Sequence, residues 1–236
     1  MDITGAFRVL TKGLSPPSYK TPKVQTACTG HMTTVYTDGS CTDGGYEEAR
    51  ARVGVWFGDG DGRNSVRVPV ELPQTNNVAE SLAVLLPGRK APRDGNLIIK
   101  TDSQYVIDVL EKYREKIEDT DWLEQTNCAV LEPTIAEIRC RQGKTTLIKV
   151  KGHSGEIGNE NTDRLAALGA EKEPGRPIDL SIDERVKVKG AKLSRMTQAL
   201  LYKGIRRVKA QSVPPRRGMV AGLDAVRHAA HSERHQ

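Results

Sequence analysis

The stretch TVYTDGSC, residues 34–41, joins a run of β-favouring residues to an acidic residue and a Gly-Ser pair. This pattern predicts a strand that stops at Asp38 and turns at Gly39 and Ser40. A strand-end aspartate is most often a turn former, but it can also place a charge at the edge of a sheet. The choice between these interpretations depends on whether other carboxylates reach the same edge.

The strands and helices expected after this stretch define the fold class. Residues 51–60 and 63–72 predict two more strands in an antiparallel meander, and Pro69 places the last of them at a sheet edge. The elements expected next are a helix (76–86), a buried strand (96–102), helices (103–117 and within 120–142), a strand (145–152) and a closing helix (159–173). This order predicts an α/β protein with a mixed five-stranded sheet and helices on its faces.

Several residues are expected to set the ends of these helices. Asn76 or Asn77 is expected to cap the first helix, and Pro87 to end it early. Ser103 is expected to open the second helix, and Pro133 to interrupt the third.

Charge is distributed unevenly along the 236 residues, whose net charge is +6. Residues 1–30 carry +3, residues 31–170 carry −5 and residues 171–236 carry +8. Basic arms commonly add affinity for phosphate backbones, although simple solvation explains a basic tail equally well. The sequence therefore divides into a flexible basic lead-in (1–31), a main domain (32–172) and a basic extension (173–236).

The extension is expected to be partly helical and partly disordered. Residues 190–207 predict one amphipathic helix, on which Leu193, Met196 and Leu200 align, and the remainder to residue 236 is expected to be disordered.

Compartment and cysteine usage point to an intracellular protein. No apolar run approaches the roughly 20 residues that span a bilayer, and the N-terminal residues lack the apolar core of a secretory signal. The four cysteines, Cys28, Cys41, Cys128 and Cys140, form no CxxC pair and lack zinc-site spacing with histidine, so we expect reduced thiols. The nucleus or cytoplasm is the expected location, with a mitochondrion as an alternative.

Four carboxylates occupy comparable positions in the expected elements. Asp38 and Asp102 end two strands, whereas Glu80 and Asp163 lie near the starts of two helices. Each has an ordinary structural explanation as a turn former or as a partner of the helix dipole. Together, however, clustered carboxylates repel unless cations compensate them, and Mg²⁺ prefers such oxygen ligands. The set therefore favours metal-assisted hydrolysis of a phosphodiester.

Four motifs resemble the signatures of ribonuclease H, type 1. They are YTDGS (36–40), TNNVAE (75–80), TDSQYV (101–106) and VKGHSGEIGNENTDRLA (150–166), and they occur in the family's order over about residues 32–170. The resemblance implies the ribonuclease H-like fold, with strands 1–3 as an antiparallel meander, strands 4 and 5 parallel, and helices on both faces. It also implies an endoribonuclease that cleaves the RNA strand of RNA–DNA hybrids and leaves 3′-hydroxyl and 5′-phosphate ends. Separately, we expect a monomer without a membrane partner.

The same resemblance implies roles for individual residues. The catalytic set would be Asp38, Glu80, Asp102, Asp163 and His153, with the four carboxylates holding two Mg²⁺ ions, for which Mn²⁺ is a substitute. His153 would assist the water nucleophile or product release as a proton carrier. The residues expected to contact the hybrid are Gly39, Ser40, Asn76, Asn77, Gln104 and Asn159.

One region departs from the family's pattern. Many members carry a basic, Trp-rich protrusion after the second helix, whereas residues 111–122 here read EKYREKIEDTDW and keep only Trp122 of the aromatic residues. The basic extension is expected to supply the phosphate contacts that this segment lacks.

Two alternatives to an active enzyme remain open from the sequence. An inactive nucleic-acid-binding module on the same fold usually loses a carboxylate, and this chain keeps all four. A related nuclease or transposase would share the fold, since fold alone does not fix function, but not the combined TNN, TDSQ and GHSG elements.

Overall fold

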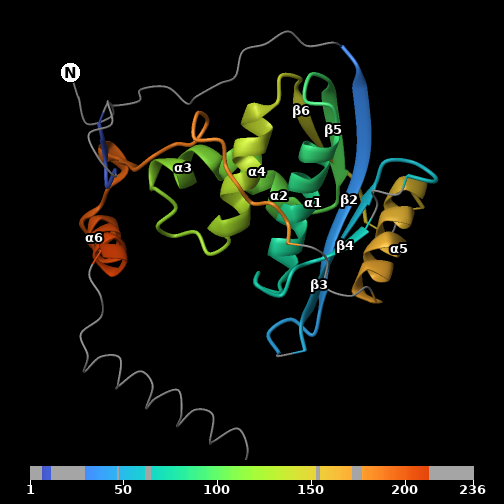
Figure 1. The fold of residues 1–236 in the computed structure, drawn as a ribbon, viewed down its shortest axis with the longest axis horizontal. Coiled ribbons are helices and arrows are strands. Elements are labelled where there is room, and N and C mark those ends of the chain that lie inside the picture. The colour runs from blue at the N-terminus through green and yellow to red at the C-terminus, as the bar shows by residue number, and fades with distance from the viewer. Residues whose placement is uncertain are drawn as a thin grey trace, which may run out of the picture.

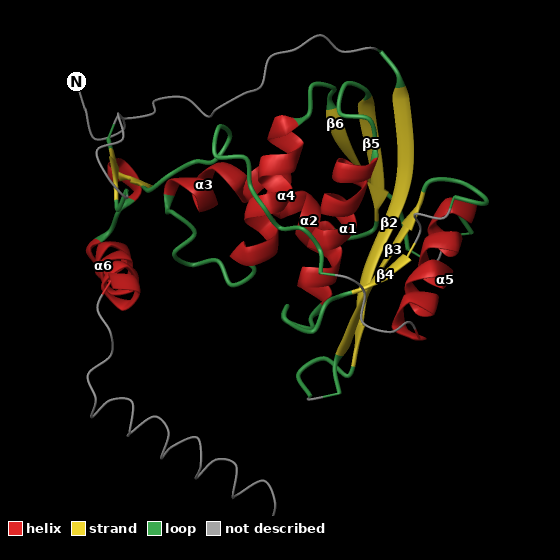
Figure 2. Cartoon of the chain, in the orientation of Figure 1, coloured by secondary structure: helices red, strands yellow, loops and turns green. Residues whose placement is uncertain are grey.

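The computed structural model describes residues 7–11, 30–46, 48–61, 65–152, 155–171 and 177–212. Figure 2 shows how helices and strands are distributed over this part of the chain. The strands are β1 (Arg8–Val9), β2 (Met32–Thr42), β3 (Arg50–Trp56), β4 (Ser65–Arg67), β5 (Asn96–Thr101), β6 (Thr145–Lys149) and β7 (Ala191–Lys192). The helices are α1 (Asn76–Lys90), α2 (Gln104–Ile107), the π-helical segment η2 (Asp108–Tyr113), α3 (Arg114–Asp119), α4 (Cys128–Cys140), α5 (Ile157–Glu171), the 3₁₀ turn η3 (Leu193–Arg195) and α6 (Gln198–Ser212).

The main sheet has the order β4-β3-β2-β5-β6. Strands β2, β3 and β4 pair antiparallel, whereas β5 pairs parallel to β2 and β6 parallel to β5. Helix α5 covers one face of this sheet, and α1, α2 and α4 lie on the other (Figure 1). The predicted mixed five-stranded sheet with helices on both faces is therefore confirmed. The third predicted strand lies at the edge, as Pro69 indicates, but it is shortened to Ser65–Arg67.

Strand β2 is longer than the sequence predicts. The expected stop at Asp38 is wrong, because β2 continues to Thr42 and pairs with β3 through Gly39 and Ser40. What ends near Asp38 is the other partner: the pairing of β2 with β5 stops at Thr37 and Thr101. Asp38 thus lies within a strand, at the point where one of its two neighbours ends.

Helix α1 also differs from its predicted ends. Its N-cap is Thr75, whose side chain accepts a hydrogen bond from the N–H of Val78, rather than Asn76 or Asn77. The helix continues through Pro87 to Lys90. A proline inside a helix costs one backbone hydrogen bond, and here the surrounding turns are buried in the core, which offsets that loss.

Two further helices bear on the predictions. Ser103 caps α2 by accepting from the N–H of Val106, as predicted. The predicted interruption at Pro133 is wrong, because α4 runs from Cys128 to Cys140. Pro133 cannot donate to a carbonyl one turn earlier, but the helix is buried there, and the Thr134 hydroxyl bonds the Val130 carbonyl at 2.8 Å.

The hydrophobic core lies between the sheet and the helices of the α1 face. Its central part packs Val35, Leu97 and Ile99 of the sheet against Leu131 and Ile135 of α4. A neighbouring cluster joins β3 to the apolar face of α1. This packing holds α1 rigidly over β2.

The terminal segments are more ordered than predicted. Arg8 and Val9, from the expected flexible lead-in, form β1 and pair antiparallel with β7 of the extension. The single helix expected over residues 190–207 is also wrong in its start, because β7 and η3 come first and α6 begins at Gln198. The disorder expected after residue 207 is wrong as far as Ser212, where α6 ends, and residues 213–236 lie outside those described.

Two general features complete the description of the chain. Within the described ranges no helix combines the length and apolar character needed to cross a bilayer. Cys41, Cys128 and Cys140 are free thiols, and Cys28 lies outside the described residues.

Candidate active site

Asp38 and Asp102 lie side by side where β2 and β5 separate. The last paired residues are Thr37 and Thr101, so the two aspartates occupy the next positions of neighbouring parallel strands. Adjacent strands are about 4.8 Å apart, which brings the two carboxylates together. The predicted juxtaposition is confirmed, although it arises from the end of β5 and not from the end of β2.

Glu80 reaches these aspartates because Gly39 lets α1 approach β2 closely. A Cβ atom at Gly39 would lie 2.2 Å from the backbone nitrogen of Glu80, a distance that no side chain tolerates. Asp38, Glu80 and Asp102 each offer a carboxylate oxygen within 4.8 Å of the others. The site therefore needs glycine at position 39 so that α1 can pack against β2. In the turn predicted from the sequence, Gly39 would have had a different role.

Asp163 comes from α5, on the other face of the sheet. Two glycines bring this helix close: a Cβ at Gly54 would lie 2.3 Å from the Thr162 carbonyl oxygen, and one at Gly158 would lie 2.4 Å from the Tyr36 ring. The charge of Asp163 helps to raise the pKa of Asp38. Asp163 thus acts electrostatically on the cluster, although it is not among the three carboxylates that meet within 4.8 Å.

The surroundings of the cluster raise the pKa values of two of its carboxyl groups. Burial, with the charges of Asp38 and Asp102, raises the pKa of Glu80 from 4.5 to about 9. Burial, with the charges of Asp102 and Asp163, raises the pKa of Asp38 from 3.8 to about 6. Without a cation, the protein therefore favours protonated carboxyls at this site.

These features fit a divalent metal ion. The Oε2 atom of Glu80 is buried and has no hydrogen-bond partner among the described residues, so it is an acceptor that lacks a donor. A cation bound among the oxygens of Asp38, Glu80 and Asp102 would satisfy that atom and remove the repulsion that raises both pKa values. The geometry thus supports the predicted metal site at three of its four ligands.

Two cationic side chains that the sequence reasoning missed border the cluster. Arg52 pairs with Ser40 across β2 and β3, donates from Nε to the Ser40 Oγ at 2.9 Å, and lowers the pKa of Asp38 in part. Lys149 donates from Nζ to the backbone carbonyl of Asp102 at 2.6 Å, and its charge lowers the pKa of Glu80 in part. The strand register, which places Arg52 beside Ser40, is the sequence signal that could have identified Arg52. For Lys149, the alternation of residues at the end of β6 is only a weak signal.

Gly152, the residue before His153, lies close to the cluster. His153 and Ser154 lie outside the described residues. The residue before them, Gly152, would place a Cβ atom 2.7 Å from the Oδ2 of Asp102. The chain therefore passes against Asp102 immediately before His153.

A polar triad fixes the chain where it leaves this loop and enters α5. The Tyr36 hydroxyl donates to the Glu156 Oε1 at 2.7 Å, and Lys100 Nζ donates to both, at 2.6 Å and 2.9 Å. Tyr36 and Lys100 are paired on β2 and β5, two residues before Asp38 and Asp102. The triad thus ties the start of α5 to the two strands that carry the aspartates.

The residues predicted to contact a hybrid differ in their accessibility. Asn76, Asn77 and Gln104 are exposed, and Gln104 donates to the Asp108 Oδ1 at 3.1 Å. Ser40 is half-buried beside Arg52, as described above. Asn159, in contrast, is fully buried, and neither of its amide atoms finds a hydrogen-bond partner among the described residues. Asn159 thus has no exposed surface with which to make the predicted contact with a hybrid.

Trp122 is not a surface aromatic residue. Its side chain is only 7% exposed and belongs to the core cluster of α2 and α4. Trp122, the tryptophan of the segment 111–122 that differs from the family's pattern, therefore has a structural role in the core.

Comparison with known proteins gives a consistent family match. The RNase H family model matches residues 30–171. Ribonuclease H1 of Rattus norvegicus is 33% identical over 153 residues, which cover 62% of this chain and 53% of that protein. Ribonuclease H of Schizosaccharomyces pombe is 36% identical over 140 residues (58% and 52%), and Ribonuclease H of Desulforamulus reducens is 30% identical over 161 residues (62% and 92%). The chain thus spans about half the length of the rat and fission yeast relatives.

Proposed function

Because the chain belongs to the ribonuclease H family, we propose that it hydrolyses the RNA strand of RNA–DNA hybrids as an endoribonuclease. The products would carry 3′-hydroxyl and 5′-phosphate ends. The observation that carries this proposal is the meeting of Asp38, Glu80 and Asp102 within 4.8 Å at the junction of β2, β5 and α1. An inactive binding module is less well supported, because these half-buried carboxylates repel one another unless a cation compensates them.

The cofactor in this proposal is a pair of Mg²⁺ ions, with Mn²⁺ as a substitute. Asp38, Glu80, Asp102 and Asp163 would hold them. Two bound cations would offset the carboxylate charge, polarise the phosphodiester and make the attacking water more acidic. The chain itself supplies the rigid strand and helix packing that keeps the carboxylates in register.

His153 would carry a proton to or from the reacting groups. The close passage of Gly152 against Asp102 supports this role, because it brings the preceding backbone to the edge of the cluster. The Tyr36, Lys100 and Glu156 triad would then limit how far the loop departs from that position.

Contacts with the hybrid would come from the exposed side of the same junction. Asn76, Asn77 and Gln104 offer amides that both donate and accept, which suits the minor groove and the 2′-hydroxyls of an RNA strand. Ser40 would lie near the RNA backbone, with Arg52 holding its hydroxyl, whereas Gly39 is buried against α1 and would act by letting that helix approach.

The test is a substrate panel with end-labelled strands. The purified full chain, supplied with Mg²⁺, should cut the RNA of a hybrid and leave its DNA strand, double-stranded RNA and single-stranded RNA intact. Product ends should be 5′-phosphates that a phosphatase removes. Equal cutting of single-stranded RNA, or no cutting of the hybrid, would overturn the proposal.

A further inference from the structure

Helix α6 is held on the main domain by contacts from both ends of the chain. β1 pairs with β7 just before α6, and Arg8 donates to the Asp119 Oδ1 at 3.0 Å and to the Glu118 carbonyl at 2.6 Å. Lys192 and Arg195 add ion pairs to the same Asp119 carboxylate. Asp119 is only 5% exposed, so these contacts fix the segment that leads into α6.

The inner side of α6 is adapted to this position. Leu200 and Gly204 are buried, and a Cβ at Gly204 would lie 2.2 Å from a methyl carbon of Leu10. One helical turn further, Arg207 pairs with the Asp121 carboxylate and donates to its backbone carbonyl at 2.8 Å. The orientation of α6 about its own axis is therefore set.

The outer side of α6 is cationic. Its sequence, QALLYKGIRRVKAQS, contains four basic residues and no acidic residue. Arg207 is used in docking and Lys203 pairs with Glu124 at 3.2 Å, but Arg206 and Lys209 are exposed and point away from that interface. Arg206 lies over the ring of Tyr202, with its guanidinium carbon 6.0 Å from the ring centroid.

The site and α6 are connected by one nearly continuous helix. Residues 104–119, which form α2, η2 and α3, start two residues after Asp102 and end at the residue that Arg8 binds. Figure 1 shows this path leading from the sheet towards α6, at the end of the molecule opposite α5. Sixteen residues at about 1.5 Å each separate the site from Asp119 by roughly 20 Å, allowing for the tighter π-helical rise. Helix α6 lies beyond Asp119, so at about 3.4 Å per nucleotide its cations are at least about six base pairs from the carboxylate cluster.

From this geometry we propose that α6 is a second nucleic-acid contact, in which Arg206 and Lys209 bind duplex phosphates at least about six base pairs from the cleaved bond. The inference rests on the proposed function for the identity of the polyanion, and it concerns residues beyond the family match, which ends at residue 171. The rigid docking of α6 gives the two cations a fixed distance from the carboxylate cluster. A flexible basic tail would add affinity without any such distance dependence.

The apolar side chains at the margin of α6 suggest a second possible partner for this helix. Leu201, Ile205 and Val208 are 38%, 40% and 42% exposed, so a helix with cationic and apolar arcs could instead lie on an anionic membrane surface. Charge favours the nucleic acid, because the cations point outward whereas these side chains adjoin the docked side and are more than half covered. The experiment below includes both occupants.

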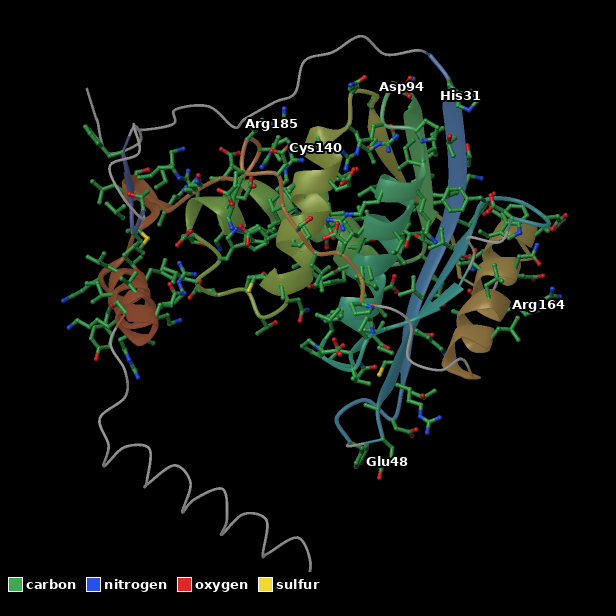
Figure 3. The ribbon with its side chains drawn as sticks, viewed as in Figure 1. His31, Glu48, Asp94, Cys140, Arg164 and Arg185 are labelled. Carbon is green, nitrogen blue, oxygen red and sulfur yellow. The ribbon has the colours of Figure 1, made fainter. Side chains whose placement is uncertain are left out.

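The test compares two double variants of the full chain. One is Arg206→Ala with Lys209→Ala; the matched control is Lys144→Ala with Arg185→Ala, which removes the same charge from exposed positions elsewhere. Figure 3 shows Arg185 beside Cys140 at the end of α4, and Lys144 precedes β6, at the sheet end opposite the carboxylates. The nucleic-acid probes are duplexes with a central block of ribonucleotides and either about four or about twelve flanking base pairs on each side, chosen to fall short of or beyond the proposed contact. The membrane probe is a vesicle that contains anionic phospholipid. Binding is measured in an Asp102→Asn background, and cleavage in the otherwise unchanged chain.

On the long duplex, the α6 variant should bind more weakly and depend less on salt. Two lost phosphate contacts lower the slope of log K against log salt by about 1.8, so the affinity difference should shrink roughly tenfold between about 50 and 200 mM salt. The loss should appear in KM rather than in kcat. On the short duplex the α6 variant should match the unchanged chain, and the control variant should match it on both.

Three results would overturn the inference. They are an unchanged salt slope on the long duplex, an equal loss on short and long duplexes, and an equal loss in the control variant. If the α6 variant instead loses binding only to vesicles that contain anionic phospholipid, α6 is a membrane contact. Failure of the proposed function is separate: it would appear as a chain that binds the hybrid without cutting it.

Discussion

Replacing Glu80 with Gln should stabilise the metal-free protein above neutral pH, although it removes a proposed metal ligand. The pKa of Glu80 is about 9 in the folded protein, against an ordinary value of 4.5. Between these values the folded state holds a proton that the unfolded state has lost. Stability is therefore full below about pH 4.5 and falls as the pH rises towards 9, at about 1.4 kcal/mol per unit. Gln keeps the shape of the protonated carboxyl but cannot ionise.

The magnitude follows from this window. Between about pH 6.5 and 8.5, wild-type protein should lose about 2.5 kcal/mol of unfolding free energy relative to the Glu80→Gln variant. Asp38, whose pKa is about 6, contributes a similar loss at lower pH, between about 4 and 6, in both proteins. Metal should narrow this difference, because an ion at about ten times its Kd adds about 1.4 kcal/mol to the protein that binds it.

The assay is urea unfolding in a chelating buffer at several pH values, followed by the fluorescence of Trp56 and the buried Trp122. Glu48→Gln is the matched control, because Glu48 lies on the exposed β2–β3 turn (Figure 3). The control should follow the wild type at every pH. A difference between Glu80→Gln and wild type that does not grow with pH would refute the account of the cluster.

Three other substitutions test contacts within the fold. Gly39→Ala should cost about 3 kcal/mol in urea unfolding, because its Cβ would meet the backbone of α1, whereas Gly44→Ala, which meets only a sulfur at 4.0 Å, should cost less than about 0.5 kcal/mol; equal costs would contradict this packing. Arg141→Met should cost about 3 kcal/mol, because the buried guanidinium donates to four backbone carbonyls that would lose their donor, and a loss below about 1 kcal/mol would contradict that role. Lys100→Met should raise the pKa of Glu156, which hydrogen bonds from Tyr36 and Lys100 now lower; an unchanged NMR titration of the Glu156 carboxyl would count against the triad.

The sequence predicts the sheet and the carboxylate cluster because both depend on local patterns. The alternation and turns of the first three strands define the meander, and Asp38 and Asp102 follow apolar runs that must pair in the core. The end of β2 is different. Whether a strand stops at Asp38 or loses one partner there depends on the length of β5, which no property of residues 34–41 reveals.

The remaining differences arise from tertiary contacts that override local preference. Pro87 and Pro133 are tolerated inside helices because core packing holds the turns around them. The pairing of β1 with β7 joins residues more than 180 positions apart, and two-residue strands leave no periodic pattern. Arg52 and Lys149 reach the site through strand register and a flexible side chain, neither of which a motif records.

The most direct test of the central claim is cleavage of a labelled RNA–DNA hybrid by the wild type, Asp102→Asn and Glu48→Gln in Mg²⁺. Asp102 lies within 4.8 Å of both Asp38 and Glu80, so losing its charge should abolish turnover while the folded state persists. Glu48→Gln should cut the hybrid at the wild-type rate. Cleavage that survives Asp102→Asn would contradict the assignment of the carboxylate cluster as the catalytic centre.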